Sequence, residues 1–172
     1  EILRLKTSPK FEKVLGAAKI TSVIFAVLWS IAFLNIYTEK NTRAAATDWI
    51  LENIPPNSVL GTEHWDDRVP IHSGEYYKYE DITMYDRPDN AGKWALMRKK
   101  FNKIDYYIIA SNRLYTPLQR LTDCKAHNDS CYPIASRFYA DLLTDKTQFK
   151  KVAEFTNYPK IFGIEIPDDD AD

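Results

Sequence analysis

Hydrophobic residues are unevenly distributed along the chain, and one uninterrupted run near its start dominates the pattern. Residues 20–36 read ITSVIFAVLWSIAFLNI and contain no charged residue. Counted from Leu15 to Tyr37, the run is long enough as a helix to cross a hydrocarbon core of ~30 Å, which takes ~20 residues. A signal peptide usually has a shorter apolar core and a small-residue cleavage site, and a buried helix in so small a domain is rarely apolar on every face. We therefore predict a transmembrane helix within residues 1–40.

Beyond residue 40, apolar residues recur with helical and strand spacings in turn. Asn41 or Thr42 can cap the first predicted helix, and Trp94, Met97 and Phe101 fall on one side of the second. Helices are predicted at residues 41–54, 90–103 and 132–145, and strands at residues 58–64, 81–86, 104–111, 149–159 and 161–168.

The strand at residues 104–111, IDYYIIAS, has the strongest pattern of these elements. Its near-continuous apolar run is typical of a central parallel strand that is covered on both faces. Helices alternating with strands predict an α/β sandwich around a small, mostly parallel sheet. We expect residues 41–172 to form this single domain.

Charged residues are distributed asymmetrically about the apolar run. Residues 1–43 hold seven basic and three acidic residues, whereas residues 44–172 hold sixteen basic and twenty-one acidic residues. The positive-inside rule then predicts a cytoplasmic N-terminus and an extracytoplasmic domain. The excess of acidic residues in that domain, without a basic stripe, argues against nucleic acid as a partner.

Two cysteines, Cys124 and Cys131, enclose a short polar loop. An extracytoplasmic compartment would permit a disulfide between them, and two unpaired thiols are the alternative. A zinc site that adds His127 fits poorly, because the spacing is not that of zinc ribbons or fingers. The loop also contains an N-glycosylation pattern at Asn128–Ser130, which matters only in a cell that glycosylates asparagine.

The densest group of candidate functional side chains follows the strand predicted at residues 58–64. It consists of Glu63, His64, Trp65, Asp66 and Asp67. Open α/β sheets place ligands at the carboxyl ends of their strands, so this segment could form a binding or interface edge. A metal site would need further convergent ligands, and the only other histidines are His72 and His127. In a structural alternative, Trp65 packs on the core while the carboxylates cap a helix or pair with Arg68.

A second candidate segment, SNRLYTP at residues 111–117, follows the strand predicted at residues 104–111. Asn112, Arg113 and Tyr115 would emerge at the same sheet edge as the first segment. Arg113 could grip a carboxylate or a phosphate, or it could form an internal ion pair with Asp66 or Asp67. The sequence contains no Gly-rich phosphate loop, G-x-S-x-G elbow or C-x-x-C motif.

Five segments stand out in combination, and they cover most of the chain from Thr42 onward. They read TRAAATDWILENIPPNSVLGTEHWDD, YDRPDNAGKWALM, DYYIIASNRLY, YPIASRFYADLL and FKKVAEFTNYP. In this succession the chain resembles the extracytoplasmic C-terminal region of bacterial GT-C-type membrane glycosyltransferases, which are related to protein mannosyltransferases and aminoarabinose transferases. The resemblance makes the apolar run the last of many membrane spans and implies further sequence at both ends of the chain.

Enzymes of this type pass a sugar from a polyprenyl-phosphate donor to a protein, lipid or glycan acceptor. Their catalytic acidic residue lies in the first outer loop, so the resemblance assigns no catalytic residue to any position here. It implies no cofactor or metal site in this chain and leaves a divalent metal open for the full enzyme. The implied partners are the membrane, the remaining transmembrane part of the enzyme and the lipid-linked sugar donor.

Two other functions fit the sequence. The chain could be a single-pass anchor that presents a sensor or interaction domain. It could also be a self-contained hydrolase that uses His64 and Asp66, which is the weaker reading because a third ligand is missing. In the transferase reading, residues 63–67 with Asn112, Arg113 and Tyr115 form the expected edge of contact with substrate or with the rest of the enzyme.

Overall fold

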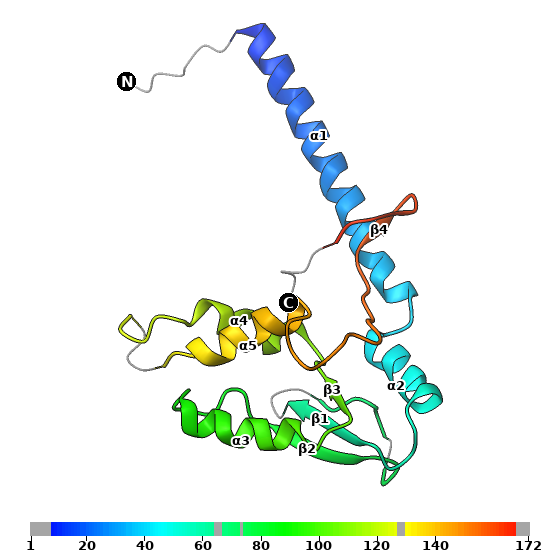
Figure 1. The fold of residues 1–172 in the computed structure, drawn as a ribbon. Coiled ribbons are helices and arrows are strands. Elements are labelled where there is room, and N and C mark those ends of the chain that lie inside the picture. The colour runs from blue at the N-terminus through cyan, green and yellow to red at the C-terminus, as the bar shows by residue number, and fades with distance from the viewer. Residues whose placement is uncertain (1–7, 64–66, 73, 127–129, 168–172) are drawn as a thin grey trace. The chain divides into compact units, whose positions relative to one another are not determined.

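The computed structural model describes residues 8–63, 67–72, 74–126 and 130–167 (Figure 1). These residues fall into two compact units. The first contains residues 8–39 together with residues 157–167, and the second contains the described residues between 40 and 156.

Helix α1, Pro9–Leu34, dominates the first unit and continues into a short 3-10 helix, η1, at Asn35–Thr38. Pro9 suits the first turn, where its missing N–H has no helical partner in any case. With 26 residues, α1 is roughly 39 Å long at 1.5 Å per residue. Its large apolar side chains are exposed on all sides, and one 18-residue window has a mean hydropathy of 2.0. By length and composition, α1 is therefore able to cross a membrane.

The first unit also contains a two-stranded antiparallel hairpin, β4 (Lys160–Ile161) and β5 (Ile164–Glu165). Strand β4 packs on α1, and hydrogen bonds join the two segments. The Asn35 side chain donates to the Lys160 carbonyl at 3.2 Å, and the Asn157 side chain donates to the Ile36 carbonyl at 2.8 Å. The hairpin is thus fixed to the end of α1.

The second unit is built on a three-stranded parallel sheet in the order β2-β1-β3. Its strands are β1 (Val59–Glu63), β2 (Lys78–Ile82) and β3 (Tyr106–Ile108). The predicted α/β class and the small parallel sheet are confirmed. A Cβ on Gly61 would lie 2.5 Å from the Cδ1 atom of Ile104, so glycine lets the Ile104 side chain pack closely on β1, and a larger residue would displace it.

Five helical segments complete the second unit, and side chains cap two of the longest. The Asn41 side chain accepts from the Arg43 and Ala44 N–H groups at the start of α2, and Asn90 accepts from Lys93 N–H at the start of α3. The segments are α2 (Thr42–Asn53), α3 (Ala91–Phe101), η2 (Asn112–Leu114), α4 (Thr116–Arg120) and α5 (Pro133–Leu143). The three predicted helices are therefore confirmed.

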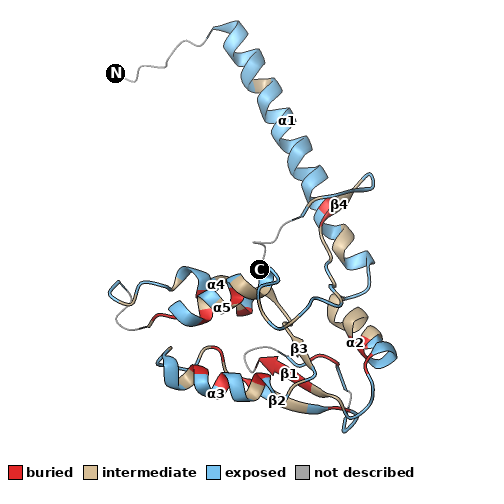
Figure 2. Ribbon diagram, in the orientation of Figure 1, coloured by how far each residue is buried: buried red, intermediate tan, exposed pale blue. Residues whose placement is uncertain are grey.

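Buried residues form two hydrophobic clusters in the second unit (Figure 2). Successive residues of β3 alternate between them, because neighbouring side chains of a strand point to opposite faces. Tyr107 packs on the cluster formed with α3 and α5, whereas Tyr106 and Ile108 pack on the cluster formed with α2. Helices therefore pack on both faces of the sheet.

The strand predictions are only partly correct. The strand predicted at residues 161–168 is interrupted by the turn between β4 and β5. The predicted central strand, β3, is three residues long and lies at an edge, because β1 takes the central position. Strand β2 begins at Lys78, before the predicted residues 81–86, and overlaps that prediction only at Asp81 and Ile82. Residues 149–159 form no strand; Phe149 packs on Tyr107 and Phe155 packs on Trp49 from an irregular segment. The apolar spacing there reflects separate aromatic contacts with the core.

Candidate functional site

The first predicted segment falls partly outside the described residues, where His64, Trp65 and Asp66 lie. Of its remaining members, Glu63 ends β1 inside the domain and Asp67 is almost fully exposed. Asp67 forms an ion pair with Arg43 at 3.4 Å, and Arg68 pairs with Asp81 at 2.6 Å. Asp67 therefore belongs to the surface, whereas Glu63 belongs to the interior.

The second predicted segment forms η2 and the start of α4. The Ser111 side chain accepts from the Arg113 N–H group, and the exposed Arg113 offers its carbonyl to the Tyr85 hydroxyl at 3.1 Å. The half-buried Tyr115 packs on Tyr139, with ring centroids 5.8 Å apart. Tyr139 in turn contacts Glu63, so Tyr115 reaches the end of β1 through one shared tyrosine. The half-buried Asn112 starts η2.

Glu63 is the centre of a buried polar cluster that joins three elements of the second unit. The residue is 3% exposed at the carboxyl end of β1. Its Oε1 atom accepts from the Tyr107 hydroxyl of β3 at 2.5 Å and from the Tyr139 hydroxyl of α5. Its Oε2 atom has no hydrogen-bond partner among the described residues. One oxygen of the carboxyl group therefore accepts two hydrogen bonds, and the other accepts none from the described residues.

This incomplete matching changes the acid–base properties of the cluster. Burial disfavours the charged carboxylate and raises the pKa of Glu63 from 4.5 to about 7, although the two tyrosine hydrogen bonds act in the opposite direction. Burial and the nearby Glu63 charge also raise the pKa of Tyr85 to about 12. Near neutral pH, Glu63 can therefore gain or lose a proton.

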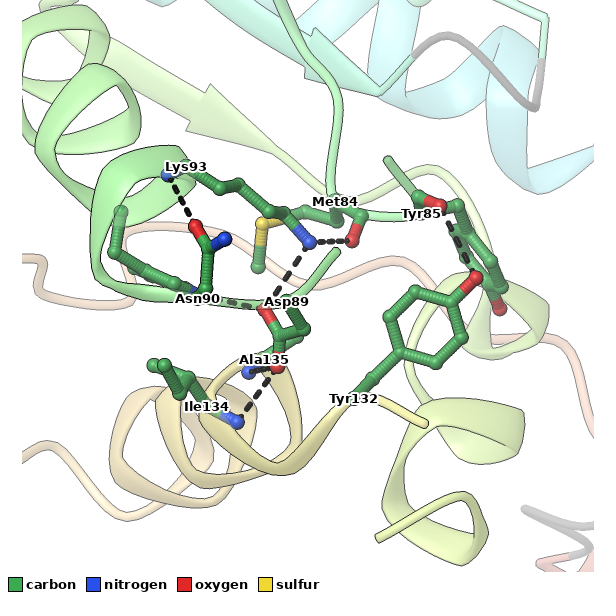
Figure 3. Close-up of polar contacts among 9 residues, drawn as sticks. Met84, Tyr85, Asp89, Asn90, Lys93, Tyr132, Ile134 and Ala135 are labelled. Atoms are coloured by element: carbon green, nitrogen blue, oxygen red, sulfur yellow. Dashed lines mark hydrogen bonds and ion pairs between the residues drawn. The ribbon is translucent and has the colours of Figure 1, made fainter. Parts of the chain in front are cut away.

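A second buried carboxyl group, Asp89, was not among the predicted site residues. Figure 3 shows it between the start of α3 and the start of α5. One oxygen accepts from the Trp94 indole at 2.7 Å and from the Lys93 ammonium at 3.2 Å. The other accepts from the Ile134 and Ala135 N–H groups at 2.7 and 3.0 Å. Asp89 therefore caps α5 with both oxygens matched.

The four donors outweigh the effect of burial on Asp89. Burial raises the pKa of this carboxyl, but the Trp94, Ala135 and Ile134 hydrogen bonds and the Lys93 charge together hold it below its usual value. Lys93 also donates to the Met84 carbonyl at 2.6 Å. The arrangement is an ion pair that joins two helices, and its donors favour the charged carboxylate, which leaves Asp89 poorly suited to proton transfer.

A surface cavity of about 370 Å³ lies beside this ion pair. Its basic side chains already contact protein groups: Lys93 contacts Asp89, Arg87 donates to the Ser130 hydroxyl at 2.5 Å, and Lys100 donates to the Asp81 carbonyl. It is lined by Thr83, Asp86, Arg87, Pro88, Asn90, Lys93, Leu96, Met97 and Lys100.

The described part of the chain holds no group of three His, Cys, Asp or Glu side chains that could bind a metal ion. Cys124 and Cys131 are joined in a disulfide, with Cα atoms 4.9 Å apart.

Searches against known proteins found no matching family model, no matching curated protein and no matching solved structure. Among the described residues, the candidate site therefore centres on the buried Glu63 carboxyl, whose pKa is raised to about 7.

Proposed function

We propose that this chain is the last membrane span and the extracytoplasmic domain of a polyprenyl-phosphate-sugar-dependent membrane glycosyltransferase. Helix α1 is the observation that carries this proposal, because its apolar side chains are exposed on all sides. Water would make that exposure costly, whereas a hydrocarbon core favours it. The resemblance of the five segments to GT-C-type enzymes supplies the reaction class.

Two further features support an extracytoplasmic position for the second unit. Residues 1–43 hold seven basic and three acidic residues, and five of these basic residues lie at or before Lys19, a distribution for which the positive-inside rule predicts a cytoplasmic N-terminus. The Cys124–Cys131 disulfide suits an oxidising compartment.

In this proposal the domain is not catalytic; it covers the active site or helps to hold the acceptor. Its proposed contact edge combines the exposed Asp67, which follows β1, with Asn112, Arg113 and Tyr115, which follow β3. The edge presents both charges and an aromatic ring, which suits recognition of hydroxyl-rich or phosphorylated groups. Glu63 lies beneath this edge and supports it through Tyr139, which packs on Tyr115.

The proposal is tested by deleting the gene and measuring lipid-linked sugars by mass spectrometry. Loss of the transferase should leave its donor unused, so a polyprenyl-monophosphate sugar should accumulate and return to its normal level on complementation. An unchanged lipid profile would overturn the proposal. It would favour the alternative of a membrane-anchored sensor or interaction domain.

Complementation with Asp67→Ala tests the contact edge separately. The Asp67 side chain is 97% exposed and pairs with the partly exposed Arg43, so its loss should change the free energy of unfolding by less than about 0.5 kcal/mol. Asp67→Ala should nevertheless lower sugar transfer several-fold, whereas the exposed Asp86→Ala should not. Equal losses of transfer and stability would make Asp67 a structural residue.

A further inference from the structure

The β4–β5 hairpin ends in an apolar tip that no other described residue covers. Its two-residue turn consists of Phe162 and Gly163, with Ile161 paired to Ile164 across the hairpin. Phe162 is 87% exposed and Ile164 is 66% exposed. Single exposed apolar residues are common, but two at one tip, one of them a phenylalanine, form a small apolar surface.

The backbone of the turn makes phenylalanine an unexpected choice. Phe162 and Gly163 have φ values of +52° and +79°, as in the primed turns that suit β-hairpins. Asn and Asp are favoured at the first position because they tolerate positive φ, whereas a bulky side chain there is a true outlier. Neither turn geometry nor burial accounts for Phe162, which points to a contact outside the chain.

The hairpin lies where α1 ends, within the same compact unit (Figure 1). Strand β4 packs on α1, whose one buried residue is Ala32. The Asn35 and Asn157 side chains each donate a hydrogen bond that joins the hairpin segment to the end of the helix. If α1 spans the bilayer, these contacts hold the hairpin tip at the level of the membrane surface.

The charges of the hairpin are arranged to leave its tip neutral. Lys160 and Glu165 form an ion pair at 3.2 Å across the base of the hairpin, and the four residues between them carry no charge. Tyr37, another exposed aromatic residue, lies in η1 at the end of α1. Aromatic side chains are enriched at the membrane–water interface, where apolar rings contact lipid and polar groups contact water.

We infer that the tip of the β4–β5 hairpin, Phe162 with Ile164, inserts into the lipid surface beside the outer end of α1. The hairpin is then a second, shallow anchor that fixes the rotation of the helix end through Asn35 and Asn157. This inference rests on the part of the proposed function in which α1 spans the membrane. It does not depend on the reaction that the enzyme performs.

Spin labels in the full chain, reconstituted in phosphatidylcholine–phosphatidylglycerol vesicles, test the insertion. One label is placed at Phe162→Cys and another at Ile164→Cys, since the native cysteines are paired in a disulfide. Leu96→Cys is the matched control, because Leu96 is an apolar residue of the second unit with 58% exposure. Val23→Cys, at 63% exposure in the middle of α1, is the reference for lipid.

The measurement is the collision rate of each label with molecular oxygen, which concentrates in lipid, and with a water-soluble nickel chelate. We expect the oxygen-to-nickel ratio at residues 162 and 164 to exceed that at residue 96 at least threefold and to fall below that at residue 23. A ratio equal to that of Leu96→Cys would overturn the inference. Low collision rates with both reagents would also overturn it, since protein would then cover the tip.

The Val23→Cys label separates this inference from the proposed function. If that label reports lipid while residues 162 and 164 report water, only the hairpin anchor fails. If the Val23→Cys label reports water, α1 does not span the bilayer, and both the anchor and the membrane enzyme are excluded. If all three labels report lipid but deleting the gene leaves the lipid-linked sugars unchanged, the hairpin anchor stands and the proposed transferase reaction is rejected.

Discussion

Glu63 and Asp89 are buried carboxyl groups of the same unit, yet their surroundings favour opposite charge states. Asp89, with a side chain 1% exposed, receives four hydrogen bonds shared between both oxygens. Glu63 receives two, both on one oxygen, and no cation is among its hydrogen-bond donors. The pKa of Asp89 is lowered and that of Glu63 is raised to about 7. Burial raises the pKa of both carboxyl groups; the four donors, one of them a cation, together outweigh burial at Asp89, whereas two tyrosine hydroxyls do not outweigh it at Glu63.

The difference separates a structural role from a chemical one. Asp89 joins the starts of α3 and α5 and keeps its charge to do so. Glu63 lies at the carboxyl end of the central strand, where a change of protonation can alter the contacts of Tyr107 and Tyr139. Perturbed carboxyl groups in such positions are typical of functional sites.

The largest expected effect is that of Asp89→Asn. The variant leaves Lys93, whose side chain is 7% exposed, without its carboxylate and weakens the cap of α5. Removing one member of a buried ion pair typically costs about 3–5 kcal/mol. Urea unfolding of the full chain in detergent micelles, followed by tryptophan fluorescence, measures the loss.

Asp86→Asn is the matched control for that experiment, because Asp86 is an exposed carboxyl three residues away. We expect a change below about 0.5 kcal/mol for this surface substitution. Similar free energies of unfolding for the two variants would show that the Asp89 ion pair does not hold the helices together.

The next effect in size is the pH dependence of stability that Glu63 causes. Its pKa is about 7 in the folded chain against an ordinary value of 4.5. Between these values the folded state binds more protons than the unfolded state, so stability falls as pH rises. For this single group, the free energy of unfolding should be about 3 kcal/mol lower above pH 7 than below pH 4.5.

Glu63→Gln should remove this pH dependence, because glutamine keeps an acceptor for the tyrosines and cannot ionise. The stability difference between the variant and the wild type should therefore shift in favour of the variant as pH rises. Asp89 has the opposite effect on stability. Because its pKa is lowered in the folded chain, it stabilises the fold at pH values above its pKa in the unfolded chain, and this stabilisation is lost as pH falls. Glu75→Gln, at an exposed site, should leave the wild-type profile unchanged; a matching shift there would contradict the assignment to Glu63.

The smallest expected effect is that of Tyr139→Phe, which deletes one hydroxyl and no ring. It should cost about 1–2 kcal/mol for a buried hydrogen bond to a carboxyl. Because that hydrogen bond lowers the pKa of Glu63, the variant should also move the Glu63 titration upward, as followed by the infrared carboxyl band. Tyr132→Phe is the control; it removes a hydroxyl bonded to the Tyr85 carbonyl and should leave that titration unchanged.

Helices could be predicted from the sequence because their signals are local. Asn41 and Asn90 cap α2 and α3 from adjacent positions, and Pro133 begins α5. The place of β3 could not be predicted, because its apolar residues serve an edge strand that α3, α5 and Phe149 cover. Periodicity reports that a side chain is buried and does not report which neighbour buries it.

For the candidate site, the sequence likewise indicated the segments involved but not the contacts between them. Glu63 and Tyr115 both lie in segments that the sequence singled out at strand ends. Their connection through Tyr139 depends on a helix 76 residues from Glu63. Asp89 precedes the cap residue Asn90, which signals a helix start, but its partners at α5 lie 45 and 46 residues further on. Only the folded chain brings such donors together.

The strand order β2-β1-β3 also affects how the chain folds while it is being synthesised. Strand β1 emerges first, and its Leu60 must wait for Tyr79 on one side and Tyr106 on the other. Such non-local parallel pairing is intrinsically slow, and an unpaired strand edge is a template for aggregation. A nascent chain that stops before Tyr106 therefore carries an open edge on its central strand, which closes only when β3 has been synthesised.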